Sequence, residues 1–270
     1  MPISPALPRL RDMTLTGYSL PLSPSGSSSS LTSPPWYFSG EVVMVDYRVD
    51  PAAAARFLPP ELELGPDPGA AAAVFAEWQW CSESGAELED PAGSRFSEFL
   101  ILLGCSFGGE PMARCPYAWV DQAVPLMRGW VQGMPKQFGS VHLTRPVQVG
   151  RAGPRMAAGG RFSASLAVRD RRVAEVAVTL AEPAEPPHLH TVPLVHNRHF
   201  PAWVPGEKPL HQLVASSVRD VEFGPVWRGS GAFRLLPGAD EDLASLAPVE
   251  VGAGYAFSYA ETLVSGRRLG

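Results

Sequence analysis

Lysine is scarce in this chain, and one of its two lysines has neighbours that suit amine chemistry. Of 22 basic side chains, only Lys136 and Lys208 are lysines. An arginine supplies positive charge equally well, but it does not supply an amine that can lose its proton. Lys136 lies in RGWVQGMPKQFGSV (residues 128–141), near Trp130, Met134 and Phe138. Such neighbours exclude water and disfavour the ammonium form, and a neutral amine can attack a ketone or aldehyde to form an imine.

An imine on Lys136 would open several reactions. Its protonated form accepts electrons and stabilises a carbanion equivalent on the adjacent carbon, which serves decarboxylation, aldol addition and dehydration. The alternative is a loop lysine whose ammonium group reaches water along its flexible stem. Residue types alone favour this alternative.

Composition limits the classes of function. A net charge of -5 argues against a nucleic-acid partner, because phosphate binding needs a basic face. No apolar run is long enough to span a bilayer, and the N-terminus lacks the apolar region of a signal peptide. Cys81, Cys105 and Cys115 have no metal-binding spacing and are expected to be reduced thiols of a cytoplasmic protein.

The chain divides into a tail and one domain. Residues 1–35 are rich in Ser and Pro and are expected to be disordered or loosely packed. Residues 36–270 are expected to form a single domain, since barrels of this length are often undivided.

Alternating apolar residues predict that this domain is mostly β. In residues 254–262, Tyr255, Phe257, Tyr259 and Glu261 share one face. Short helices are expected at residues 50–60, with Asp50 as the cap, and at 238–246. Many strands with few helices indicate a closed, largely antiparallel β-barrel. The predicted strands are 41–49, 71–80, 96–107, 117–124, 161–168, 173–180 and 254–262.

Four segments resemble the acetoacetate decarboxylase superfamily. Gly133-Met134-Pro135-Lys136 is similar to its G-x-P-K signature, in which the lysine forms the imine. Residues 37–64 resemble its first strand, helix and following turn, residues 95–98 its Y-T-E segment, and residues 120–125 its L-D-N-E stretch. The resemblance runs from about residue 36 to the C-terminus and is strongest between 95 and 139.

The resemblance implies the barrel of this superfamily, an imine on Lys136, and Glu98 as the general acid and base. A carboxylate facing the barrel interior could move protons at the enamine carbon. The alternative for Glu98 is an ion pair with Arg95, three residues away.

Departures from the decarboxylase pattern shift the expected reaction. Gln137 stands where that enzyme has a second lysine, and Gly40 aligns with its carboxylate-binding arginine. A further family glutamate aligns at or beside Ala76. Arg128 and Gln132 instead resemble the aldolase–dehydratase branch, in which they hold the carboxylate and oxo groups of a 2-oxo acid. The alternative for Arg128 is a surface salt bridge.

The same branch places a tyrosine or glutamate in the last strand, so Tyr259 and Glu261 are substrate-binding candidates. Their alternative roles are an aromatic side chain of the barrel lining and a carboxylate at its rim. A histidine cluster offers a competing zinc site, but it has no third ligand at a diagnostic spacing, and no metal is expected. The cluster comprises His188, His190, His196 and His199.

These observations predict a lyase that forms a Schiff base with a small keto acid and needs no cofactor. Aldol condensation with dehydration, in a natural-product pathway, ranks above decarboxylation. The alternatives are a true β-keto acid decarboxylase and a non-catalytic barrel that binds a small molecule. By analogy with its relatives the protein is expected to be a homo-oligomer, with no nucleic-acid or membrane partner.

Overall fold

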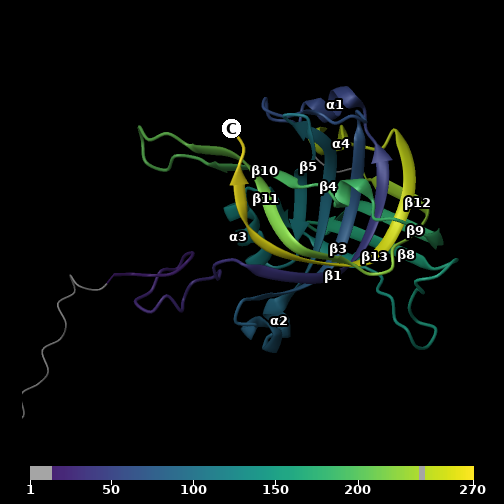
Figure 1. The fold of residues 1–270 in the computed structure, drawn as a ribbon, viewed down its shortest axis with the longest axis horizontal. Helices are drawn as coiled ribbons and strands as arrows, with labels where there is room; N and C mark the ends of the chain where they lie inside the picture. The colour runs from purple at the N-terminus through teal and green to yellow at the C-terminus, as the bar shows by residue number, and fades with distance from the viewer. Residues whose placement is uncertain (1–13, 237–240) are drawn as a thin grey trace, which may run out of the picture.

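The computed structural model describes residues 14–236 and 241–270. Seven strands of this part close into a ring (Figure 1), because β1 pairs with both β3 and β13. Neighbouring strands of the ring are antiparallel except β5 and β10. The short strand β6 (Lys136–Phe138) pairs in parallel with β5. In ring order the strands are β1 (Trp36–Arg48), β3 (Ala70–Ser82), β4 (Arg95–Phe107), β5 (Glu110–Val120), β10 (Leu194–Phe200), β11 (Leu210–Phe223) and β13 (Glu250–Arg268).

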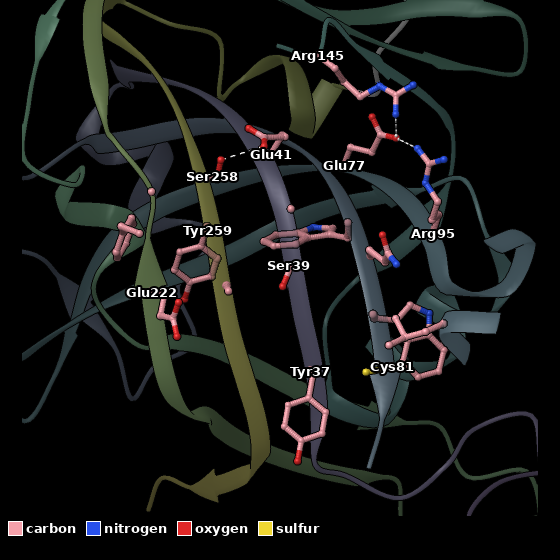
Figure 2. A pocket seen from close by; sticks show the side chains of 18 residues that line it. Tyr37, Ser39, Glu41, Glu77, Cys81, Arg95, Arg145, Glu222, Ser258 and Tyr259 are labelled. Atoms are coloured by element: carbon pink, nitrogen blue, oxygen red, sulfur yellow. Dashed lines mark hydrogen bonds and ion pairs between the residues drawn. The ribbon is translucent and has the colours of Figure 1, made fainter. Parts of the chain in front are cut away.

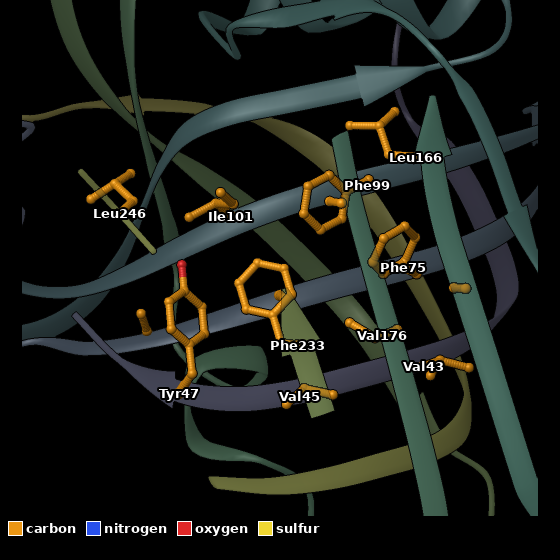
Figure 3. Close-up of a cluster of buried hydrophobic side chains, with 14 of the residues drawn as sticks. Val43, Val45, Tyr47, Phe75, Phe99, Ile101, Leu166, Val176, Phe233 and Leu246 are labelled. Carbon is orange, nitrogen blue, oxygen red and sulfur yellow. The ribbon is translucent and has the colours of Figure 1, made fainter. Parts of the chain in front are cut away.

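Four further strands continue the sheet from β13 and cover the outside of the ring. In sheet order they are β12 (Trp227–Leu235), β9 (Arg171–Pro183), β8 (Arg161–Val168) and β7 (Ser140–Leu143). Between them and the outer face of β1, β3 and β4 lies an apolar core that includes Phe75, Phe99 and Phe233 (Figure 3). The two-residue strand β2 (Glu63–Leu64) pairs with β4.

The predicted barrel is confirmed, and strand alternation assigns each side chain to one side of the wall. On β4, Glu98 and Leu100 face the inside of the ring, whereas Phe99 and Ile101 face the outer core. Side chains that alternate along a strand point to opposite faces of the sheet. A shift of one residue in register would therefore exchange the two environments.

Three helices bear on the sequence predictions. The helix α1 (Pro51–Ala55) begins where expected, with Asp50 accepting a hydrogen bond from the Ala52 N–H at 2.8 Å, but it ends earlier than residue 60. The predicted strand 117–124 is wrong beyond Val120, where β5 ends, because α3 (Ala123–Gln132) begins after two intervening residues. In the predicted helix 238–246, α4 (Glu241–Ala244) forms, and residues 238–240 lie outside the described residues.

The remaining helical turns are short. They are α2 (Pro91–Ser94) and the 3-10 turns η2 (Ala86–Glu89) and η3 (His188–His190). No helix in the described ranges is both long and apolar enough to cross a membrane.

Part of the predicted tail contacts the barrel. Residues 1–13 lie outside the described residues. Beyond them, Leu31 is buried, and the Tyr18 ring meets the Trp36 ring edge-on with 6.1 Å between centroids. The Ser19 and Ser29 hydroxyls, 3.1 Å apart, join the two ends of this segment.

Candidate active site

A cavity of about 560 Å³ lies inside the ring, and every candidate site residue lines it. The strands β4, β6 and β13 and the helix α3 supply these side chains from different parts of the sequence. Because β13 closes the ring onto β1, its residues reach the same cavity as those of β4 and β6. The candidates are Glu98, Arg128, Gln132, Lys136, Tyr259 and Glu261.

Two glycines shape the backbone around Lys136. Gly133 ends α3 with a φ of 91°, a left-handed conformation that favours glycine at a helix C-terminus. The chain then turns into β6, and the Lys136 side chain runs back along α3. A Cβ atom at Gly129 would lie 2.4 Å from Lys136 Cδ, so only glycine leaves room for the lysine there.

The surroundings of Lys136 differ from those expected. Lys136 is 6% exposed. Trp130 and Phe138, expected to exclude water from it, are 52% and 54% exposed, and that expectation is wrong. The Trp130 indole instead donates to the Lys136 carbonyl at 2.9 Å. The Phe96 ring, whose centroid is 5.6 Å from Lys136 Nζ, and the buried Met134 cover the lysine.

Lys136 forms a buried ion pair with Glu98. Its Nζ is 2.7 Å from Glu98 Oε1, and both side chains are almost fully buried. The Trp78 indole donates to Glu98 Oε2 at 3.1 Å. The alternative pairing of Glu98 with Arg95 is wrong, since Arg95 pairs with Glu77 on the outer face. A carboxylate in contact with the amine can exchange protons with it and with a group bound to it.

Trp78 packs against Gly40, the residue that the sequence resemblance aligns with a family arginine. Gly40 is paired with Trp78 on β3 and with Tyr259 on β13. A Cβ atom at Gly40 would lie 2.6 Å from Trp78 Cε3 and 2.4 Å from the Glu77 carbonyl oxygen. The indole that holds Glu98 therefore occupies the space that a larger side chain at residue 40 would need.

Arg128 is a buried cation enclosed by aromatic rings. Its guanidinium carbon lies 4.7 Å from the Phe38 centroid and 4.4 Å from that of Trp80. The residue is 1% exposed, so the alternative of a surface salt bridge is wrong. Neither Nη1 nor Nη2 has a hydrogen-bond partner among the described residues. Burial lowers the pKa of the guanidinium, which Glu98 and Glu87 partly offset.

Tyr259 and Glu261 form a second polar pair on the wall that β13 supplies. The Tyr259 hydroxyl donates to Glu261 Oε2 at 2.7 Å. Burial raises the pKa of both groups, and the charges of Glu98 and Lys136 also act on the pKa of Glu261. Glu261 is thus close enough to the lysine pair to interact with it electrostatically. Gln132, the last residue of α3, also lines the cavity.

A second hollow lies on the opposite face of β1, β3 and β13 (Figure 2). It is larger, about 850 Å³, but no lysine lines it. Its Glu77 accepts hydrogen bonds from Arg95 and Arg145, and Glu41 accepts one from the Ser258 hydroxyl at 2.9 Å. Of the six candidates only Tyr259 reaches it, so amine chemistry belongs to the cavity inside the ring.

Several residues of the site were not predicted from the sequence. Phe38, Trp78 and Phe96 line the cavity, and His190, considered only as a metal ligand, lines it as well. In the described ranges no three histidine, cysteine or acidic side chains come together in a metal-binding arrangement. The alternation along residues 71–80 could have identified Trp78. It places Trp78 on the face opposite Phe75 and Glu77, which is the face toward the cavity.

The family that the sequence matches is consistent with the lysine and carboxylate found in the cavity. A profile of the family described as acetoacetate decarboxylase matches residues 19–269. The chain belongs to the acetoacetate decarboxylase family. It is therefore an enzyme of this superfamily, and the match includes residues 19–35 of the predicted tail. A search of curated proteins gave no match.

Solved structures give closer likenesses. The enduracididine biosynthesis enzyme MppR, complexed with the condensation product of pyruvate and imidazole 4-carboxaldehyde, is 64% identical with a TM-score of 0.92, over 94% of this chain and 97% of that one. The same enzyme complexed with pyruvate is also 64% identical, with a TM-score of 0.92 over 95% and 98% of the two chains. An acetoacetate decarboxylase-like enzyme from Sphingomonas wittichii RW1 is 27% identical, with a TM-score of 0.86 over 94% and 99%.

Proposed function

We propose that this enzyme joins a small 2-oxo acid such as pyruvate to an aldehyde by aldol condensation and dehydration, through a Schiff base on Lys136. The observation that carries the proposal is the buried contact of 2.7 Å between Lys136 Nζ and Glu98 Oε1 inside the cavity. The complexes of MppR with pyruvate and with a pyruvate condensation product support it. A role in enduracididine biosynthesis, as in MppR, is part of the proposal.

Imine formation needs a neutral amine and a proton acceptor. Glu98 takes a proton from Lys136, and Nζ then attacks C2 of the 2-oxo acid while the carbonyl π electrons move to oxygen. The resulting alkoxide takes this proton back from Glu98, and Glu98 then removes a proton from Nζ and passes it to the same oxygen. Water leaves as the nitrogen lone pair forms the protonated imine, which leaves Glu98 ionised. The protonated imine then loses a proton from C3 to give the enamine, with Glu98 again the nearest base. The lysine imine itself accepts the electrons, so these steps need no cofactor.

Arg128 and Gln132 are assigned to the carboxylate and oxo end of the 2-oxo acid. Arg128 Nη1 and Nη2 have no partner within residues 14–236 and 241–270, and a carboxylate could accept one hydrogen bond from each. An unpaired buried donor costs about 1–3 kcal/mol, which a bound carboxylate would recover. Gln132 lies four residues further along α3 and lines the same cavity.

Decarboxylation ranks lower because the positions that distinguish the decarboxylase differ here. Gln137 is exposed and carries no charge to act on Lys136. Trp78 fills the space beside Gly40, where the family arginine would stand. By analogy with relatives we also expect a homo-oligomer, which sedimentation of the purified protein would test. The cytoplasmic location expected from the three unpaired cysteines stays a prediction.

Borohydride trapping tests the proposal directly. Borohydride reduces an imine and fixes the substrate to the amine that formed it. We expect incubation with pyruvate and borohydride to add one reduced pyruvate to the chain, located by peptide mass spectrometry at Lys136. Lys208→Ala is the matched control and should be labelled as the parent is. Labelling absent across a panel of 2-oxo acids, or confined to Lys208 and the N-terminus, would instead indicate the non-catalytic binding barrel. Release of CO2 from a β-keto acid such as acetoacetate would indicate the decarboxylase.

A further inference from the structure

His190 lines the cavity, and none of the steps above uses it. It ends the turn η3, whose following residues 191–194 also form the cavity wall. Its ring meets the ring of Tyr259 edge-on at 4.6 Å between centroids, and that of Phe257 at 5.1 Å. Its Nε2 is buried and has no hydrogen-bond partner among the residues that the structure describes. A buried polar atom without a partner costs free energy, and such atoms in native proteins call for an explanation.

The surroundings of His190 keep its ring uncharged. Burial among aromatic rings lowers its pKa to about 4. A neutral imidazole carries one N–H donor and one acceptor nitrogen. It can therefore donate to an oxygen without adding a cation that would compete with Arg128 for the carboxylate of the 2-oxo acid.

The position of His190 assigns it to the second reactant. The proposed function places the 2-oxo acid on Lys136 and Arg128, which β6 and α3 supply. The wall left for the electrophile is the one formed by η3, β11 and β13, where His190, Phe223 and Tyr259 contact one another. The Tyr259–Glu261 pair connects this wall to the lysine, since the charge of Lys136 acts on Glu261.

We propose that His190 binds the aldehyde and donates a hydrogen bond to its carbonyl oxygen; this inference rests on the proposed function. In the condensation step, C3 of the enamine forms a bond to the aldehyde carbon. The carbonyl π electrons move to the aldehyde oxygen while the nitrogen lone pair restores the protonated imine. His190 stabilises the negative charge on that oxygen, which then takes a proton from the Tyr259–Glu261 pair. A positioned donor acts most strongly where charge develops in the transition state.

Two substitutions at residue 190 separate the hydrogen bond from the packing. His190→Phe keeps an aromatic ring against Tyr259 but removes the donor, and His190→Gln keeps an N–H donor. With pyruvate and imidazole 4-carboxaldehyde as probes, we expect His190→Phe to lower kcat/KM for the aldehyde by about 10²–10³-fold, the loss typical of one such donor. His190→Gln should retain part of the rate. His188→Phe is the matched control on the same turn, because His188 is exposed, and it should change nothing.

Trapping of pyruvate by borohydride distinguishes failure of this inference from failure of the proposed function. If His190 serves the aldehyde alone, His190→Phe should form the Lys136 adduct at the parental rate and with the parental KM for pyruvate. Parental condensation kinetics in His190→Phe would overturn the inference, as would an equal loss of imine formation and condensation, which indicates a structural role. If His190→Phe fails to fold, equal losses of both steps in His190→Gln would overturn it. A parent enzyme that traps no pyruvate would overturn the proposed function itself, and with it the role of His190.

Discussion

The two faces of β4 differ in one charged side chain: the outer face is apolar from Phe99 to Leu103, whereas the inner face carries the Glu98 carboxylate beside Leu100. Outward, Phe99, Ile101 and Leu103 are fully buried, and Phe99 stacks on Phe75 with 4.3 Å between ring centroids. Inward, Glu98 has a lysine and an indole as its polar contacts and an open cavity beside it. The apolar face fixes the strand, and this rigidity holds the carboxylate at its lysine. We therefore expect inward substitutions to change activity and outward ones to change stability.

The largest effect is expected at Lys136. Lys136→Met removes the amine while keeping a long side chain in the groove beside Gly129. Without the nucleophile no imine forms, so turnover should fall by at least about 10⁴-fold, in the range seen when other covalent catalysts lose their nucleophile. The rate of condensation product formation measures this loss, with Lys208→Ala as the control. Turnover within tenfold of the parent would exclude Lys136 as the reacting amine.

The outer face is tested by Phe99→Ala. The side chain is fully buried in the core of Figure 3, so its removal leaves a cavity and should lower the free energy of unfolding by about 3–5 kcal/mol. Urea denaturation measures this change. Glu98→Gln, its neighbour on the inner face, should lose most activity with a smaller change in stability. If the two variants were equally destabilised and equally inactive, the prediction that the outer face governs stability and the inner face governs activity would be wrong.

Arg128→Lys tests the carboxylate site. A lysine keeps the positive charge but replaces a planar two-contact donor with a single point charge. Loss of such charge-assisted contacts is worth about 1.5–3 kcal/mol, so kcat/KM for pyruvate should fall about 10- to 150-fold. Steady-state kinetics with pyruvate as the varied substrate measure this decrease in kcat/KM. The control is Arg145→Lys in the hollow of Figure 2, where Arg145 is exposed and pairs with Glu77, and its kcat/KM should match the parent. An unchanged value for Arg128→Lys would remove the guanidinium from substrate binding.

The smallest effect is expected at Asp46 on β1, whose carboxyl pKa burial raises to about 6. The folded state therefore holds a proton more tightly than the unfolded state. The stability this provides is present at pH values below the usual Asp range and is lost as pH rises through about 6. Asp46→Asn cannot ionise, and about two pKa units correspond to up to about 3 kcal/mol. At pH 8 it should therefore melt above the parent by at least about 2–4 °C, the shift for about 1 kcal/mol in a domain of this size. At pH 4 the melting temperatures should agree, and a gap as large at pH 4 as at pH 8 would contradict the shifted pKa.

Local patterns predicted the strands better than they predicted the site. The strands around residues 96–107, 161–168 and 254–262 formed as expected, because alternation along a strand is a local property. The helix α3 was missed although Pro125 in its first turn and Gly133 after its last residue are helix signals. The roles of the six candidates came from the family resemblance. Local alternation could not show that they meet, since this depends on β13 closing the ring against β1.

His190 and Trp78 show what the motifs left out. Neither belongs to a family motif used in the sequence analysis, and each acquires its place through contacts with distant strands. The Trp78 indole reaches Glu98 across the β3–β4 pair, and the His190 ring reaches Tyr259 from a turn that precedes β10. Side-chain direction at such positions depends on register and ring closure, which only the assembled barrel determines.

The close packing of Lys136 against Gly129 also bears on the entropy of the reaction. A free lysine side chain samples many rotamers, and fixing it costs about 1.5–2 kcal/mol. Here the stem lies in a groove that a single methyl group at residue 129 would block, so folding has already confined it. When the amine attacks a carbonyl, little further rotational freedom remains to be lost. A glycine that touches no substrate would thus lower the activation entropy penalty of the first covalent step.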